Sequence, residues 1–298
     1  MIVEAGMPRL DRLSGLSRGM HDRAACHRDD PDWLDQAWKR SRVLVLGTDM
    51  TTAVEDSGTG PRLHLRHPDE ISADPLRLFL GEYEETPYFA VLGERDVAGD
   101  RWASLLHVGA ELSDLDAGLF TEAVALGQWH LRHPCCSRCG ELTEVHRAGW
   151  VRRCPRDGSE HWPRTDPAII VLVHDGADRC VLGRQASWPA GRYSILAGFV
   201  EPGEPAEAAV AREVAEEVGI AVTDLRYLGS QPWPFPASLM LGYSARVQGD
   251  PTLRLTDSEL EDARWVHRDE LRRGDGVLTI ARPVSIAHRI ITDWLDAG

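Results

Sequence analysis

The chain has 298 residues, of which 43% are hydrophobic and 27% are charged, and this length and composition suit two domains and a sizeable core. The formal net charge of −14 argues against strong non-specific binding to a nucleic-acid backbone, which needs clustered Lys and Arg. No run of 18 apolar residues and no signal-peptide pattern is visible, so we expect no membrane partner and a cytoplasmic location.

The first 130 residues predict a mixed α/β domain without a catalytic cluster. Residues 1–32 show little periodicity and are expected to be weakly structured. The elements expected after them are strands at 42–46 and 88–92, a loop or hairpin connection at 49–61, a strand or short helix at 76–80 and a helix at 116–130. This helix is expected to place Leu119, Ala123, Leu126 and His130 along one face. The histidines here are scattered along the chain, which indicates structural roles.

Residues 131–163 contain a compact cysteine cluster. Cys136 and Cys139 form a CxxC pair and Cys154 follows after fourteen residues, a spacing similar to a zinc ribbon. The fourth position holds Asp157, whose carboxylate can ligate zinc but makes a harder site. We expect a structural zinc, because a closed four-ligand site leaves no position for substrate. A ribbon that folds without metal is the other interpretation, and the nearby side chains that could replace the fourth ligand are Cys135, His146 and His161.

From about residue 164 the order of strands with two helices predicts an α/β/α sandwich. The expected strands are 168–173, 179–184, 193–196 (leading into a metal-binding loop), 225–229, 239–247 and 262–266. A last helix with a wide apolar stripe is expected from about Pro283.

The stretch Gly198–Ile220 is predicted to be a short loop that runs into a helix. Pro205 suits the first helical position, because the N–H that proline lacks would have no intrahelical partner there. Gly219 is placed to end the helix in a left-handed cap.

This helix carries a cluster of acidic side chains. Glu213, Glu216 and Glu217 lie within one and a half turns, so their charges repel each other unless a cation sits among them. Hard oxygen ligands at this spacing suit Mg²⁺ or Mn²⁺. The simpler interpretation is a solvated acidic helix in which Arg212 pairs with Glu216, but it does not explain the loop glycines.

The segment 230–238 reads SQPWPFPAS and contains three prolines that fix backbone torsions. We expect a rigid loop that presents Trp233 and Phe235 as flat surfaces for ring stacking. The other interpretation is a hydrophobic plug between subunits or domains.

Together these motifs resemble the NADH pyrophosphatase family of Nudix hydrolases. The residues that match the Nudix box are Gly198, Glu204, Arg212, Glu213, Val214, Glu216, Glu217, Gly219 and Ile220. The cysteine cluster before the box and the SQPWPFPAS segment after it match the same family. The resemblance is good over residues from about 116 to 298 and only general over the first hundred.

The resemblance implies an α+β fold with a family N-terminal domain at 1–130, a zinc-ribbon-like motif at 131–163 and a Nudix domain at 164–298. It implies cleavage of NADH and NAD⁺ into nicotinamide mononucleotide and AMP, and removal of the NAD cap from RNA 5′ ends. It also implies a homodimer.

Carried onto this sequence, the family's metal ligands are Glu213, Glu217, the carbonyl of Ala197 and Glu259. The substrate contacts implied are Gln231, Pro232, Trp233, Pro234, Phe235, Pro236, Ala237, Ser238, Trp162 and Ala287. Trp162 replaces the family's tyrosine and Asp157 replaces its fourth cysteine.

The expected chemistry is metal-assisted hydrolysis of a diphosphate. We expect Glu216 to be the general base, with Glu217 or Glu259 able to share that role, and Arg212 to hold the carboxylates in place. The alternatives are hydrolysis of another dinucleoside diphosphate such as ADP-ribose or FAD, a Nudix ligand sensor without turnover, and a zinc-ribbon nucleic-acid binder, which the net charge disfavours.

Overall fold

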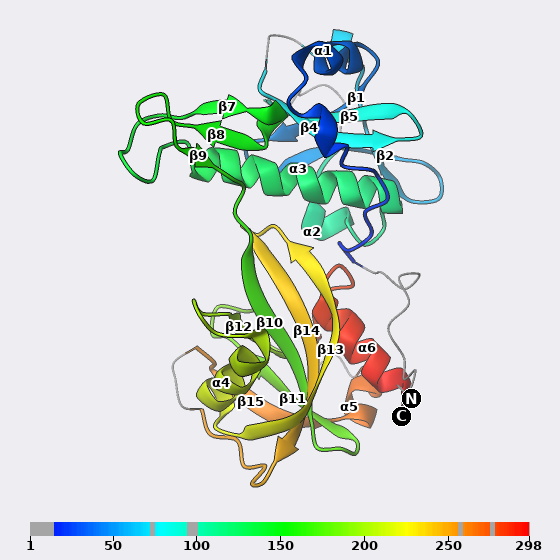
Figure 1. Cartoon of the computed structure of the whole chain (residues 1–298). Helices are drawn as coiled ribbons and strands as arrows, with labels where there is room; N and C mark the ends of the chain where they lie inside the picture. The colour runs from blue at the N-terminus through cyan, green and yellow to red at the C-terminus, as the bar shows by residue number, and fades with distance from the viewer. Residues whose placement is uncertain (1–14, 72–74, 94–100, 256–258, 275–277, 298) are drawn as a thin grey trace, which may run out of the picture. The chain divides into compact units, whose positions relative to one another are not determined.

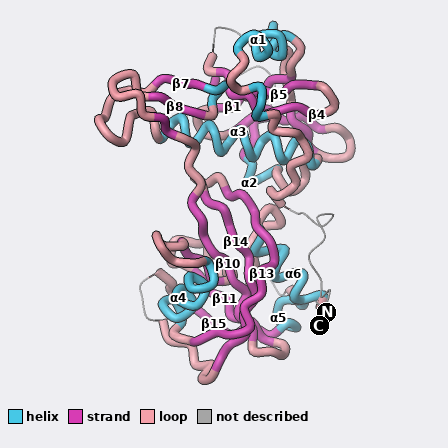
Figure 2. The backbone as a smooth tube through the Cα atoms, viewed as in Figure 1, coloured by secondary structure: helices cyan, strands magenta, loops and turns pink. Residues whose placement is uncertain are grey.

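The computed structural model, drawn in Figures 1 and 2, describes residues 15–71, 75–93, 101–255, 259–274 and 278–297. The chain divides into two compact units. The unit that carries the Nudix box contains Asp166–Pro232 and Ser238–Gly298, and the other contains Leu16–Thr165 with Trp233–Ala237. No helix among the described residues combines the length and the apolar character needed to cross a membrane.

The Nudix-box unit is built on a mixed six-stranded sheet in the order β13-β14-β10-β11-β15, with β12 paired to β10. Its strands are β10 (Asp166–His174), β11 (Arg179–Arg184), β12 (Leu196–Phe199), β13 (Ala221–Trp233), β14 (Ser238–Gln248) and β15 (Asp262–His267). Its helices are α4 (Ala206–Val218), α5 (Arg268–Arg273) and α6 (Ile286–Asp296). Strands β10 and β14 run parallel, whereas β11 and β12 are antiparallel to β10.

Alternating side chains of β10 pack into two different cores, one on each face of the sheet. Ile169 and Val171 lie in a buried cluster with Val210 and Val214 of α4. Ile170 lies in a second cluster with Ile286, Ile290 and Ile291 of α6. Because successive strand residues point to opposite faces, α4 and α6 cover the two faces of the sheet (Figure 1), which confirms the predicted α/β/α sandwich.

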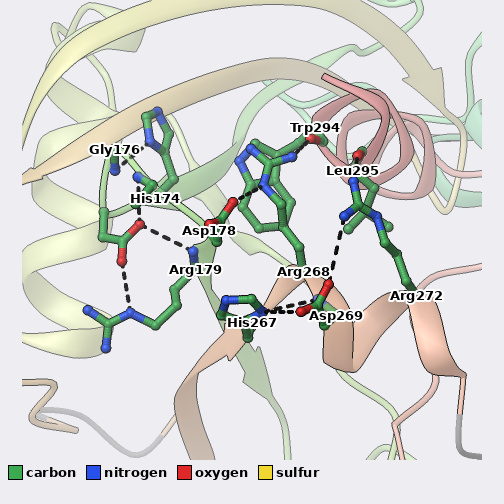
Figure 3. Close-up of polar contacts among 12 residues, drawn as sticks. His174, Gly176, Asp178, Arg179, His267, Arg268, Asp269, Arg272, Trp294 and Leu295 are labelled. Atoms are coloured by element: carbon green, nitrogen blue, oxygen red, sulfur yellow. Dashed lines mark hydrogen bonds and ion pairs between the residues drawn. The ribbon is translucent and has the colours of Figure 1, made fainter. Parts of the chain in front are cut away.

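A set of polar contacts ties α6 to the helix α5 (Figure 3). Arg268 is 8% exposed, pairs with Asp178 at 3.2 Å and donates to the carbonyl of Trp294. Its guanidinium carbon also lies 3.9 Å from the centre of the Trp294 ring. Arg179 pairs with Asp175 at 2.8 Å on the hairpin between β10 and β11.

The other unit contains a second six-stranded sheet, in the order β3-β2-β1-β5-β4 with β6 paired to β2. Its strands are β1 (Arg42–Gly47), β2 (Thr51–Asp56), β3 (Pro61–Leu63), β4 (Arg77–Tyr83), β5 (Thr86–Gly93) and β6 (Arg101–Ser104). Its helical segments are η2 (Ala25–His27), α1 (Pro31–Lys39), η3 (Pro68–Glu70), α2 (Leu105–Val108) and α3 (Asp114–Arg132).

The helix α3 has the buried face that its sequence predicts. Ser113 caps it by accepting a hydrogen bond from the N–H of Asp116 at 3.1 Å. The side chains expected on one face (Leu119, Ala123, Leu126 and His130) are all buried. Figure 2 shows α3 as the long helix beside the strands of this unit.

A small antiparallel sheet follows α3, in the order β7-β8-β9. It consists of β7 (Glu144–His146), β8 (Val151–Arg153) and β9 (Glu160–His161), with η4 (Arg147–Gly149) between the first two strands. Arg152 ties this sheet to α3, because its guanidinium is hydrogen-bonded to His130 Nδ1 at 3.0 Å and to the hydroxyl and carbonyl of Thr143 at 2.7 Å each.

Most of the predicted elements are confirmed, and the exceptions lie at their ends, in one loop and at 193–196, where the strand β12 begins only at Leu196 and continues to Phe199. The expected loop or hairpin connection at 49–61 contains the strand β2, which includes the β-branched residues Thr51, Thr52 and Val54 and pairs with β6. Pro205 precedes α4 as its N-cap with extended backbone torsions, and its carbonyl accepts from Ala208 and Ala209. The prediction that it is the first helical residue is therefore wrong by one position.

Three further expectations need correction or fall partly outside the described residues. The stretch 230–233 belongs to β13 rather than to a loop, so only residues 234–237 form the turn. The last helix begins at Ile286, where Ser285 caps it, and not near Pro283. Of the expected weakly structured segment, residues 1–14 lie outside the described part of the chain, and 15–32 contain η2 and the first residues of α1.

Candidate active site

The helix α4 presents its acidic side chains at two different depths. Its apolar residues Val210, Val214 and Val218 are fully buried against the sheet. Glu213 is 8% exposed and Glu217 is 3% exposed, whereas the side chain of Glu216 is 53% exposed. Gly219 ends the helix with φ 69° and ψ 21°, the left-handed cap that its sequence predicts.

Arg212 connects the carboxylates of the Nudix box. Its Nε and Nη2 donate to the two oxygens of Glu204 at 2.8 Å each, a bidentate pair. Its Nη1 donates to Glu213 and to Glu216 at 2.9 Å each, and its Nη2 also donates to the carbonyl of Phe199 at 2.9 Å. The guanidinium therefore fixes the loop before α4 and the carboxylates on it as one unit, in line with the role that the sequence predicts for it.

Gly198 is the point where the carboxylate of Glu213 meets the backbone of β12. A Cβ atom at this position would lie 1.9 Å from the Glu213 carboxyl carbon and about as close to both of its oxygens, at 2.1 and 2.2 Å. Only glycine leaves room for this contact. Because Ala197 directly precedes Gly198, the contact brings the Glu213 carboxylate to the part of the chain that holds the predicted carbonyl ligand.

Burial and neighbouring charges both shift the pKa values of these carboxyl groups. Burial raises the pKa of Glu213, Arg212 lowers it, and the charges of Glu216 and Glu259 raise it further. Glu259 is exposed and directly precedes Leu260, which packs in the same buried cluster as Val214 of α4. The hydrogen bonds from Arg212 lower the pKa of Glu204 to about 2, so this loop carboxylate stays ionised.

The predicted side-chain ligands of the catalytic metal do not form a tight set of donor atoms among the described residues. Among the described residues, one set of three or more His, Cys, Asp or Glu donor atoms lies within 4.8 Å of one another, and it is the cysteine cluster rather than Glu213, Glu217 and Glu259. Ala197 lies on β12 opposite Ile170. The donors are hard oxygens, which suit Mg²⁺ or Mn²⁺, and Gly198 lets the Glu213 carboxylate lie against the backbone next to Ala197.

The predicted substrate contacts fall into exposed and buried groups. Trp162 is 54% exposed with the guanidinium of Arg147 5.1 Å from its ring centre. Trp233 and Phe235 touch edge to face, with ring centres 5.0 Å apart. Phe199, which the sequence did not single out, is 58% exposed next to Gly198.

The buried members of the predicted set are held by the fold. Gln231 is 1% exposed and donates from its side-chain amide to the carbonyl of Val284 at 3.1 Å. Ala287 is also 1% exposed, in the first turn of α6. The remaining positions, Pro232, Pro234, Pro236, Ala237 and Ser238, form the end of β13, the turn and the start of β14, and the Phe235–Pro236 peptide is cis.

The cysteine cluster brings together the four side chains that the sequence predicts. The donor atoms of Cys136, Cys139, Cys154 and Asp157 lie within 4.8 Å of one another. The Cys139 and Cys154 sulfurs are 3.6 Å apart, and Cys136 Sγ is 3.8 Å from Asp157 Oδ2. Tetrahedral ligands about 2.0–2.3 Å from zinc are separated by similar distances, so the set fits this ion.

Ser159 is a residue of this cluster that the sequence did not reveal. Its N–H and hydroxyl donate to Asp157 Oδ1 at 2.9 and 2.6 Å, which lowers the pKa of Asp157 to about 2. The other carboxylate oxygen of Asp157, Oδ2, faces the Cys136 sulfur. The Asp-Gly-Ser sequence is typical of a turn in which an aspartate accepts a hydrogen bond from the backbone N–H two residues later. This pattern could have identified Ser159 from the sequence.

Comparisons with known proteins match both regions. Residues 131–162 match the NADH pyrophosphatase zinc ribbon domain, and residues 164–285 match the NUDIX domain. The chain is 46% identical over 298 residues to the NAD-capped RNA hydrolase NudC of Mycobacterium bovis, covering 94% of this chain and 94% of that protein.

More distant matches cover less of the chain. The human mitochondrial NAD(P)H pyrophosphatase NUDT13 is 41% identical over 201 residues, which is 62% of this chain and 57% of that protein. A solved Nudix hydrolase from Nitrosomonas europaea aligns with a TM-score of 0.45 and 20% identity, over 54% of this chain and 90% of that one.

Proposed function

Because the chain belongs to the NADH pyrophosphatase (NAD-capped RNA hydrolase) family of Nudix hydrolases, we propose that it hydrolyses the diphosphate of NADH and NAD⁺ to nicotinamide mononucleotide and AMP, and that it removes the NAD cap from RNA 5′ ends. The observation that carries this proposal is the buried carboxylate pair of Glu213 and Glu217 on α4, in a chain 46% identical to an NAD-capped RNA hydrolase.

The catalytic cation of the proposal is Mg²⁺ or Mn²⁺, held by Glu213, Glu217, Glu259 and the carbonyl of Ala197. When bound, such a cation supplies charge to the diphosphate oxygens and lowers the pKa of a water molecule. The chemistry of the site supports this choice, since its side-chain donors are carboxylates and Gly198 lets the Glu213 carboxylate lie against the backbone next to Ala197.

The chain's own residues accept the proton and orient the substrate. Glu216 is exposed on the same helix and accepts the proton of the attacking water at its carboxylate, and Arg212 keeps that carboxylate in place through its Nη1 donor. Trp162, Trp233 and Phe235 offer ring faces on which a nicotinamide or a base stacks. Water attacks one phosphorus, the anhydride bond breaks, and both mononucleotides leave with a terminal phosphate.

The zinc ribbon carries a structural zinc in this proposal. Cys136, Cys139, Cys154 and Asp157 would supply all four ligands of a tetrahedral zinc, which would leave no open position for substrate. We also propose the domain organisation 1–130, 131–163 and 164–298, a homodimer and a cytoplasmic location. Light scattering of the purified chain tests the homodimer, and a monomeric mass would exclude it.

Product analysis tests the function. Purified full-length protein is incubated with Mn²⁺ or Mg²⁺ and either NADH or NAD-capped RNA, and the products are identified by mass spectrometry. We expect nicotinamide mononucleotide and AMP from NADH, and nicotinamide mononucleotide with 5′-monophosphate RNA from capped RNA. Parallel kcat/KM values for ADP-ribose and FAD show whether another dinucleoside diphosphate is preferred. A higher value for either one, or no turnover of any of them, contradicts the proposal.

A further inference from the structure

Glu259 is followed in the sequence by two residues, Leu260 and Glu261, that are both fixed against the strand β11. We propose that Arg184 on β11 is a positioning residue, which holds Glu261 so that the carboxylate of Glu259 stays beside Glu213 on α4. This inference rests on the proposed function, in which Glu259 is a ligand of the catalytic cation.

Leu260 anchors the segment in the core that also holds α4. It is 8% exposed and lies in the same buried cluster as Leu196 of β12 and Val214 of α4. A Cβ atom at Gly183 would lie 2.9 Å from Leu260 Cδ1, so this leucine sits directly on the backbone of β11. The residue before it is therefore held at a fixed distance from the helix that carries Glu213.

Arg184 holds the other side of the segment through both its backbone and its side chain. The N–H of Glu261 donates to the carbonyl of Arg184 at 2.9 Å, and the Nη1 of Arg184 pairs with the Glu261 carboxylate. The Nη2 of Arg184 donates to the carbonyl of Trp188 at 2.9 Å. The Arg184 side chain is only 14% exposed, so one planar guanidinium links Glu261 to the loop after β11.

The consequence concerns the charge of Glu259. Glu259 directly precedes Leu260, which packs in the same buried cluster as Val214 of α4, so the backbone that carries Glu259 lies beside the helix that carries Glu213. Like charges in this position separate when the chain allows it, and the hold on Leu260 and Glu261 prevents that movement. Residues that orient a metal ligand from outside the ligand set typically change metal affinity or activity by about 10- to 100-fold when they are replaced.

Binding of Mn²⁺ alone, measured by electron paramagnetic resonance of the full-length protein without substrate, tests this role. We expect Arg184→Ala to weaken Mn²⁺ binding by about 10-fold or more. Arg184→Lys should lose nearly as much, because one ammonium group cannot span Glu261 and the Trp188 carbonyl. Arg179→Ala is the matched control, since Arg179 lies on the same strand and pairs with Asp175, and it should change binding by less than about 2-fold.

A double-mutant cycle separates positioning from a general effect on the fold. In a Glu259→Gln background, Arg184→Ala should weaken Mn²⁺ binding by less than a further factor of about 2, because the ligand that Arg184 positions is already impaired. An equal loss with and without Glu259, or unchanged binding in Arg184→Ala, overturns the inference. If Arg184→Ala does not fold, Glu261→Gln replaces it, and unchanged Mn²⁺ binding in that variant overturns the inference as well.

An error in the proposed function would give a different experimental result from an error in the positioning role. If the wild-type protein binds no Mn²⁺, or if Glu217→Gln binds it as tightly as wild type, the metal site itself is misassigned. If both behave as expected and only the Arg184 and Glu261 variants show no effect, the positioning role alone is wrong.

Discussion

The two candidate metal sites hold their donor atoms together by different means. In the cysteine cluster, turns place three sulfurs and one carboxylate oxygen within 4.8 Å of one another. On α4 the donors are like-charged carboxylates, and the guanidinium of Arg212 lies among them. Thiols that are not all ionised tolerate such proximity, whereas ionised carboxylates repel each other and need a cation between them.

This difference suggests different roles. A set whose geometry is fixed by turns and whose four positions are all taken suits a structural ion. A set that is held by a helix, an arginine and a glycine contact, next to the exposed ring of Phe199, suits an ion that meets substrate. Substitutions at the carboxylate site should therefore affect turnover, and those at the cysteine cluster should affect zinc affinity.

Replacing Glu217 should have the largest effect. Glu217→Gln removes a charge that is 3% exposed on α4 and should lower kcat for NADH by at least about 100-fold, with the fold retained. Glu207→Gln is the control, because Glu207 is exposed in the first turn of the same helix. Turnover of Glu217→Gln near the wild-type rate would contradict the assignment.

Replacing Gly198 should have the second largest effect on activity. In Gly198→Ala the new methyl group overlaps the Glu213 carboxylate and displaces it, so kcat/KM should fall by about 10- to 100-fold. Gly19→Ala, where nothing lies within 4 Å of the added atom, should leave kcat/KM unchanged. Equal activity of the two variants would show that the contact with Gly198 is not required.

Substitutions in the cysteine cluster should change the zinc affinity rather than the rate of hydrolysis. Asp157→Ala should weaken zinc binding by about 10-fold in a chelator competition, and Asp157→Cys should restore or exceed wild-type affinity. The kcat of zinc-loaded protein should change by less than about 3-fold, as for a structural ion. Zinc affinity that does not depend on residue 157 would exclude Asp157 as the fourth ligand.

The smallest expected effect is a dependence of stability on pH at the contact between α3 and the small sheet. Burial lowers the pKa of His130 to about 4, and Arg152 donates to its Nδ1, so the neutral ring donates from Nε2 to the carbonyl of Gly149. The unfolded chain takes up this proton near pH 6.5, so the stabilisation is complete above that pH and is lost as pH falls toward 4.

Between about pH 7 and pH 6 the loss should be about 0.7 kcal/mol in the free energy of unfolding. Denaturant titrations at both pH values measure it, and His130→Gln should remove this part of the pH dependence. A variant with the same pH dependence as wild type would show that another group titrates.

The sequence predicted those features that depend on local pattern. The position of α4, its glycine cap and the acidic cluster follow from spacing along one helix, and the strands at 42–46 and 88–92 follow from short apolar runs. The spacing of the cysteines likewise predicted the set that the structure brings together.

The features that the sequence did not predict depend on contacts between distant segments. The pairing of the strand at 51–56 with β6 depends on a distant segment, and the β-branched residues at 51–54 alone do not distinguish this strand from a loop or hairpin connection. The overlap of Gly198 with Glu213, and the burial of Gln231 against Val284, likewise depend on how separate elements pack. The assignments of individual ligands and substrate contacts stay predictions.

The most direct test of the account is to locate manganese while the reaction is followed. Crystals soaked with Mn²⁺ should give anomalous scattering beside Glu213 and Glu217, and the same preparation should convert NADH to nicotinamide mononucleotide and AMP only when the cation is present. No manganese at α4, or cleavage of NADH that continues unchanged in Glu217→Gln, would contradict the central claim.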